Sequence, residues 1–185
     1  MKNTYLTSHF PLIAILFFSL SFALYAENVI TTWLRDIGLY MGMREFFSDV
    51  GIKLTLLFLL VLLFFMVFSA LKLIADTINE LSLLFFSKDE EGSSLQKIRG
   101  GSWFYLLASI LSIFFMRMPL GIIITFLLGT FVYFIYFVYK ASDSMSTGGL
   151  IGMIFFHISF WSAFIFTISY AAIRLYNSLI NSLPL

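Results

Sequence analysis

The feature that most constrains this chain is an uncharged run of eighteen residues, 54–71, made almost entirely of large apolar side chains. The run holds eight Leu, four Phe and two Val. On the scale for helix insertion into a bilayer, these side chains favour insertion by roughly 4–8 kcal/mol. Lys53 and Lys72 flank the run, and their long stems let the ammonium groups reach the membrane surface. We therefore expect residues 54–71 to cross a membrane as a helix.

Four further runs approach the length of about 20 helical residues that a hydrocarbon core of ~30 Å requires. All five are continuously apolar, without the alternation of apolar and polar residues that marks a membrane β-barrel. A helix also satisfies its own backbone hydrogen bonds in lipid. The predicted fold class is an all-α, polytopic transmembrane helix bundle that forms one domain, 1–185. Its predicted spans are 10–26, 54–71, 102–116, 118–139 and 148–173.

Arg117, Met118 and Pro119 separate the third run from the fourth. A single helix over 102–139 would be about 57 Å long, which is too long for one crossing. Two spans joined by a tight turn fit better, with Pro119 in the first turn of the fourth span and the short third span met by local thinning of the bilayer. The alternative is one tilted helix with a kink at the proline.

Residues 28–51 mix charged side chains with apolar ones that recur every three or four positions. This pattern predicts an amphipathic helix that lies in the membrane interface. Trp33 and Tyr40 suit the level of the lipid headgroups.

Two more segments follow the second span. Residues 72–86 extend it with apolar and polar side chains interleaved, and Lys72, Asp76 and Glu80 lie one helical turn apart. We expect these three to pair along a solvated face of the helix. Residues 87–101 are charged and rich in Gly and Ser, which predicts a solvated loop.

The first run has two interpretations. Lys2, the apolar core and the small residues Ser21 and Ala23 would permit cleavage of a signal peptide. The stretch ahead of the core is long and weakly basic, however, and Phe22 crowds the cleavage site, so an uncleaved span is the better interpretation. With five spans, six Lys or Arg residues fall on the side of the amino terminus and five on the other side. This count favours a cytoplasmic amino terminus.

Composition excludes several classes of function. The chain has no cysteine and a net charge of +1, with two histidines, His9 and His157. Thiol nucleophiles, iron–sulfur clusters and zinc sites with Cys ligands are excluded. A concentrated basic face for nucleic acid is absent. We expect no catalytic residue, no metal and no cofactor.

Small residues recur at four-residue spacing in the last two spans. Small side chains let helix backbones approach closely in lipid, where dispersion takes over from the hydrophobic effect. We expect both faces to pack on protein, within the chain or in a homodimer. The helix-packing candidates are Gly121, Thr125 and Gly129 in the fourth span, and Gly148, Gly152, Ser159, Ala163, Thr167 and Ala171 in the fifth.

Three residues form the candidate intramembrane polar site: His157, Arg117 and Ser159. A charge at mid-bilayer costs about 2.5–3.5 kcal/mol on insertion scales, so His157 should be neutral and hydrogen-bonded. Its functional interpretation is a proton relay or a ligand contact. The alternative is a buried histidine satisfied by a hydroxyl or a carbonyl. Arg117 can bind a lipid phosphate or a carboxylate such as Asp143, or simply extend to the membrane surface.

The opening Met1-Lys2-Asn3-Thr4-Tyr5-Leu6-Thr7 and the following Phe10-Pro11-Leu12-Ile13-Ala14-Ile15 resemble a family of small uncharacterised membrane proteins from Bacillus and relatives. This resemblance implies a location in the bacterial plasma membrane. It brings no catalytic or binding residues with it.

Two functional hypotheses follow. The first is a non-enzymatic bundle that acts as an accessory or scaffold subunit of a membrane complex, or as a homo-oligomer. The second is a small transporter or lipid-handling protein with a cavity lined by His157, Ser159, Thr125 and Tyr133. A water-accessible cavity that reaches His157 would favour the second. An intramembrane enzyme would need a further polar residue that converges on His157.

Overall fold

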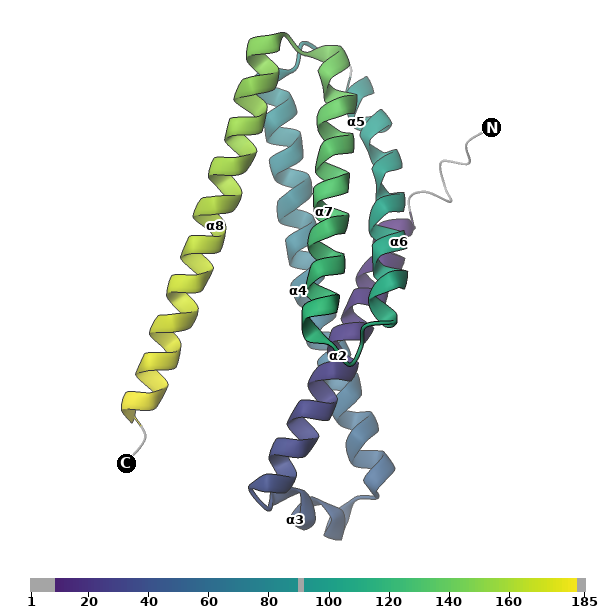
Figure 1. The fold of residues 1–185 in the computed structure, drawn as a ribbon, viewed down its shortest axis with the longest axis vertical. Helices are drawn as coiled ribbons and strands as arrows, with labels where there is room; N and C mark the ends of the chain where they lie inside the picture. The colour runs from purple at the N-terminus through teal and green to yellow at the C-terminus, as the bar shows by residue number, and fades with distance from the viewer. Residues whose placement is uncertain (1–8, 90–91, 183–185) are drawn as a thin grey trace.

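The computed structural model describes residues 9–89 and 92–182, and Figure 1 draws its fold. The described residues form helices and short connections, with no strand among them beyond an isolated bridge between Ser87 and Met145. The predicted fold class, a bundle of apolar helices, is confirmed. Lys2, which entered both the cleavage and the orientation arguments, lies outside the described residues.

The first two long helices form an antiparallel pair, α2 (Phe10–Asp36) and α4 (Asp49–Phe86), with the short helix α3 (Leu39–Phe46) between them at one end of the molecule. The segment predicted as one amphipathic helix, 28–51, is therefore divided among three helices. Gly38 ends the first piece with a left-handed φ of 76°, which glycine adopts without a steric penalty. The Ser48 hydroxyl begins the last piece by accepting a hydrogen bond from the Gly51 N–H at 3.1 Å.

The chain then turns back through α5 (Ser93–Ile98), a 3-10 turn η1 (Arg99–Gly101) and α6 (Ser102–Ile113). A helix thus lies inside the segment predicted as a loop, 87–101, of which residues 90–91 are outside the described part. The chain turns again before α7 (Pro119–Ala141), which Pro119 opens, and η2 (Ser142–Ser144) leads into α8 (Thr147–Ser182).

Four of the described helices, α2, α4, α7 and α8, are long and apolar enough to cross a membrane. The third predicted span, 102–116, corresponds to α6, whose 12 residues extend only about 18 Å. A crossing at this point would need local thinning of the bilayer or help from α5 and η1. The count of five spans stays a prediction.

Helix α2 packs against both α4 and α6, and α6 packs against α7. The contact between α2 and α6 uses small polar residues, and the Ser21 and Ser112 hydroxyls lie 2.8 Å apart in a buried hydrogen bond. Cleavage after Ala23 would remove the half of α2 that makes this contact. That the first span is uncleaved remains an expectation.

Helix α8 leaves the bundle. It contacts α4 and the upper end of α7, and then diverges from them until it stands apart (Figure 1). Every residue from 165 to 181 is exposed. Half of this helix therefore offers its surface to lipid or to another protein.

Candidate functional site

Two contacts fix the level of α4 relative to its neighbours. The Phe68 ring of α4 lies with its centroid 5.4 Å from that of Phe126 on α7. Eleven residues further along α4, the Asn79 amide donates to the Tyr133 hydroxyl at 3.4 Å. Every α4 residue between Phe68 and Asn79 is therefore level with the middle of α7. Helix α7 carries no charged residue before Lys140.

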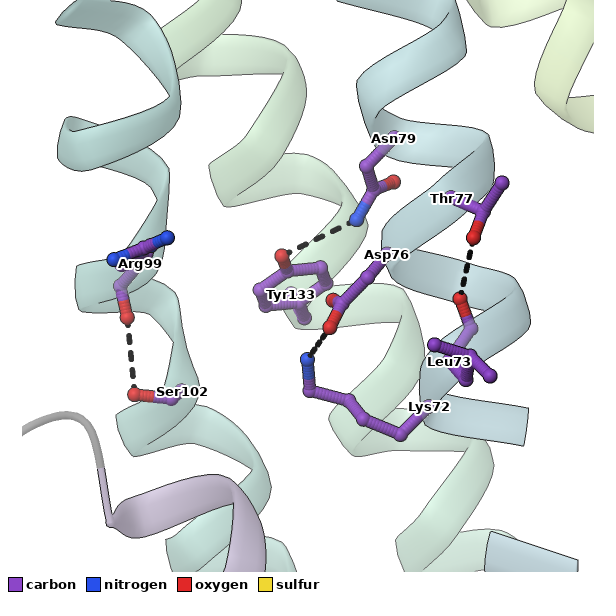
Figure 2. A network of polar contacts seen from close by, with 8 residues as sticks. All are labelled: Lys72, Leu73, Asp76, Thr77, Asn79, Arg99, Ser102 and Tyr133. Atoms are coloured by element: carbon purple, nitrogen blue, oxygen red, sulfur yellow. Dashed lines mark hydrogen bonds and ion pairs between the residues drawn. The ribbon is translucent and has the colours of Figure 1, made fainter. Parts of the chain in front are cut away.

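Lys72 and Asp76 lie between these two levels and form an ion pair along α4. Figure 2 shows the pair beside Tyr133, with Lys72 and Asp76 turned toward the neighbouring helices. Their side chains are 36% and 45% exposed. The expected pairing of Lys72 with Asp76 is present, Glu80 is exposed, and the pair lies level with the apolar middle of α7. A pair of charges in the hydrocarbon region of a membrane is costly, and ionisable residues placed there are usually functional.

His157 of α8 is the most enclosed ionisable group of the site, with 3% of its surface exposed. Its Nδ1 lies 3.0 Å from the carbonyl oxygen of Met153, one turn back on the same helix. Its Nε2 lies 3.2 Å from Oδ1 of Asn79 on α4. The rings of Phe134 and Phe137 pack around it, with centroids 5.4 and 5.2 Å away. Each ring nitrogen of His157 thus has an oxygen atom within hydrogen-bond distance.

Asn79 joins three helices, because its amide contacts Tyr133 of α7 on one side and His157 of α8 on the other. We call Lys72, Asp76, Asn79, Tyr133 and His157 the three-helix polar cluster. Of these five residues, the sequence led us to place His157 and Tyr133 beside a possible cavity and to assign Lys72 and Asp76 to a solvated face.

Helix α6 borders the cluster. The Tyr105 hydroxyl donates to Thr130 Oγ1 on α7 at 3.2 Å, and the rings of Tyr105 and Tyr133 lie 5.2 Å apart. The absence of a side chain at Gly101 permits this arrangement, because a Cβ there would lie 2.9 Å from the Tyr133 ring. The glycine at position 101 in η1 therefore lets the Tyr133 ring lie close to the backbone of η1.

The other two members of the predicted polar site lie elsewhere. Arg117 is exposed in the turn between α6 and α7, at the opposite end of α7 from Asp143 in η2. The 23 residues of α7 separate these two by about 35 Å, so they do not pair within the chain. Ser159 is exposed on α8, on a different side of the helix from His157.

The helix-packing candidates divide into two groups. On α7, Thr125 is buried, and a Cβ on Gly129 would lie 2.7 Å from the Cβ of Ala108 on α6. Gly121 faces Phe115 and Gly152 faces Phe86, whereas a Cβ on Gly148 would have no neighbour within 4 Å. The last three candidates on α8 are all exposed: Ala163, Thr167 and Ala171. That this exposed face of α8 packs on another protein stays a prediction.

A cleft of about 600 Å³ opens between α7 and α8 and reaches His157. Apart from Thr130 and His157, its walls are apolar. Ser159, Thr125 and Tyr133, which the cavity hypothesis placed beside His157, do not line it. Among the described residues, no three His, Asp or Glu side chains come close enough together to hold a metal ion.

One signal in the sequence could have revealed the missing members of the site. Apolar residues continue after Lys72 as far as Phe86, so the helix that contains the span extends well beyond it. Asp76 and Asn79 are three residues apart, and therefore share one side of that helix. The cavity hypothesis already placed Tyr133 beside His157, but no signal joins it to Asn79, because the fourth span contains several aromatic residues of similar spacing.

Comparisons with known proteins identify a family for this chain. A family model described as a family of unknown function, DUF5366, matches residues 27–184. The chain is 46% identical over 184 residues to the uncharacterized membrane protein YufK of Bacillus subtilis (strain 168), and the match covers 100% of both chains. No solved structure matches the chain. The resemblance to a family of Bacillus membrane proteins is confirmed.

Proposed function

Because this chain belongs to the DUF5366 family of unknown function, we propose an activity from its own residues: the protein is a small membrane transporter that moves protons through the three-helix polar cluster. The observation that carries the proposal is the Lys72–Asp76 ion pair, level with the uncharged middle of α7. The proposed location is the bacterial plasma membrane, with the amino terminus in the cytoplasm.

The physical reason lies in the cost of these groups. Charged side chains in the hydrocarbon region usually face the interior of a bundle, pair with one another, and lie along the path of an ion or a proton. Packing alone would be served equally well by apolar side chains, since a buried ion pair is seldom more stable than its hydrophobic replacement. A pair kept at this depth is therefore better explained by what its protons can do.

The cluster also supplies consecutive proton-handling groups. The Asp76 carboxylate lies beside the Tyr133 ring in Figure 2. Tyr133 is hydrogen-bonded to Asn79, and Asn79 to His157. A carboxylate and an imidazole can each gain or lose a proton, and a phenol can both donate and accept a hydrogen bond, so these residues supply a polar route that joins α4, α7 and α8.

Proton flux through reconstituted vesicles tests this function. The full chain is placed in phosphatidylethanolamine–phosphatidylglycerol vesicles that contain a pH-sensitive dye and a potassium gradient, and valinomycin sets the membrane potential. We expect proton flux above that of protein-free vesicles. The Asp76→Asn variant should reduce this flux by about tenfold or more, because the amide can neither take up nor release a proton.

The matched control is Asp49→Asn. Asp49 and Lys53 form the same kind of pair on the same helix, at 3.4 Å and with similar exposure, but at the end of α4. This variant should conduct as the parent does. Equal flux in the Asp76→Asn variant and the parent, or no flux above protein-free vesicles, would contradict the proposal.

A second candidate function is an accessory or scaffold subunit, or a homo-oligomer. The observation that favours it is the free-standing half of α8, with residues 165–181 all exposed and with Ala163, Thr167 and Ala171 at four-residue spacing. Small residues at this spacing let a second helix approach closely. An assembly of this kind is compatible with transport by each copy.

Cysteine cross-linking in membranes tests the assembly. The chain has no native cysteine, so Ala163→Cys introduces a single reactive thiol. We expect oxidation to convert most of this variant into a dimer. Ile165→Cys is the control, because residue 165 lies about 200° around the helix from residue 163 and is also exposed. Cross-linking of both variants to the same extent would indicate random collision and reject this interface.

A further inference from the structure

The amide of Asn79 lies between an imidazole and a phenol, and its two ends are not chemically equivalent. Oδ1 can only accept a hydrogen bond, whereas Nδ2 can only donate. In the structure Oδ1 faces His157 Nε2 at 3.2 Å and Nδ2 faces the Tyr133 hydroxyl at 3.4 Å. The direction of the whole chain of hydrogen bonds therefore depends on which way this amide points.

The other ring nitrogen of His157 is fixed. Nδ1 lies 3.0 Å from the Met153 carbonyl oxygen, which can only accept, so Nδ1 carries a hydrogen. The remaining freedom is at Nε2. A neutral ring has a lone pair there, and a protonated ring has an N–H.

Each protonation state of Nε2 requires a different orientation of the Asn79 amide. With an N–H at Nε2, Oδ1 of Asn79 accepts from the ring and Nδ2 donates to Tyr133, as the structure has it. With a lone pair at Nε2, Nδ2 must donate to the ring, so that Oδ1 faces Tyr133 and accepts from its hydroxyl. The oxygen and nitrogen ends of an amide are nearly equal in size, so a half-turn of the side chain exchanges them without repacking.

We propose that Asn79 is a switch: its amide turns by half a revolution when His157 gains or loses the proton on Nε2, and this turn converts Tyr133 from a hydrogen-bond donor to an acceptor. The inference rests on the proposed proton transport and assigns a positioning role within it. When His157 is protonated, Tyr133 accepts from Asn79, and its own O–H is free to turn toward Asp76, which Figure 2 draws beside it. The protonation state of His157 on α8 is thus communicated through Asn79 on α4 to Tyr133 on α7.

The ionisable groups near His157 are few. On α4, Asp76 lies one turn from Asn79 on the same side of the helix, and Glu80 is exposed. On α7, the ring contacts of His157 are Phe134 and Phe137, and Tyr133 is reached through Asn79. Within α8, the nearest charged residue is Arg174, almost five turns away.

Nuclear magnetic resonance on the full chain in vesicles tests the switch. Nitrogen-15 labels on His and Asn report the ring of His157 and the amide of Asn79 together, and His9→Gln removes the other histidine signal. We expect the Asn79 amide resonance to move with pH through the same midpoint as the His157 ring. An amide that does not respond while His157 titrates, or a His157 ring that does not titrate, would overturn the proposal.

A variant in which residue 79 can only accept a hydrogen bond gives a second test of the switch. In the Asn79→Asp variant, the ionised carboxylate can accept from Nε2 but cannot donate to it, so His157 should stay protonated to a pH about one unit higher or more. Asn28→Asp, at an exposed position of α2, should leave the titration of His157 unchanged. An unchanged midpoint in Asn79→Asp would also contradict the switch.

The two proposals fail separately. Flux in the vesicle assay without a response of the Asn79 amide would overturn the switch and leave the proton-transport function intact. Coupled movement of the Asn79 and His157 signals without any flux would overturn the transport function and leave the amide turn as a property of the site.

Discussion

Replacing Lys72 with methionine is expected to destabilise the protein by up to about 3 kcal/mol, because it leaves the Asp76 carboxylate without its partner at the depth of the apolar spans. The measurement is unfolding in mixed micelles with increasing sodium dodecyl sulfate, followed by circular dichroism.

A double variant separates this effect from a loss of packing. Lys72→Met combined with Asp76→Leu removes both charges, and we expect its stability to return to that of the parent or above it. Lys53→Met, in the corresponding pair at the exposed end of α4, should change stability by less than about 1 kcal/mol, and it leaves Asp49 to accept its hydrogen bond from Tyr40. If Lys72→Met proves as mild as Lys53→Met, the Lys72–Asp76 pair is solvated and does not belong to an intramembrane site.

Replacing Gly129 with leucine is expected to disrupt the contact between α6 and α7. A Cβ at position 129 would lie 2.7 Å from the Cβ of Ala108, and a real Cβ does not approach so closely. The helices would have to separate, at a cost of about 1–3 kcal/mol or more. We expect most of this variant to be lost to aggregation, as measured by the monodisperse peak in size-exclusion chromatography.

Gly148→Leu is the control for the loss of glycine itself, because a Cβ on Gly148 would have no neighbour within 4 Å and the position should tolerate the substitution. The milder Gly129→Ala should also be destabilised, and Ala108→Gly in the same chain should restore it, since the exchange keeps one methyl group at the contact. Failure of this exchange to restore stability would show that another feature of Gly129 matters.

The position of Tyr133 illustrates why the site could not be predicted in full. Its identity and its place in the fourth span are plain in the sequence, and so is the isolated His157 in the fifth. Their relation to α4 depends on how far that helix slides along its neighbours. No local pattern encodes that distance, because apolar side chains such as Phe68 can pack at several levels along an equally apolar partner.

The unknown offset between helices also explains why the sequence led us to assign Lys72 and Asp76 to a solvated face. Judged by their own helix, they lie just beyond the eighteen-residue run 54–71 and belong to solvent. Judged by α7, they lie level with an uncharged stretch, since the contacts Phe68–Phe126 and Asn79–Tyr133 lie on either side of them along the helix. The apolar run of α4 is offset from the runs of its neighbours, and only their contacts reveal the offset.

The sequence by itself determined that the chain is a helical membrane protein, and it predicted the apolar segments that are candidates to cross the bilayer. Insertion into lipid depends on a sum over neighbouring residues, so a local count is sufficient to predict it. The tertiary structure alone decided which charges share a level with which apolar segments, and that α8 leaves the bundle after His157. These properties arise from side-chain packing between segments distant in the chain, where the fit of one surface on another sets the energy.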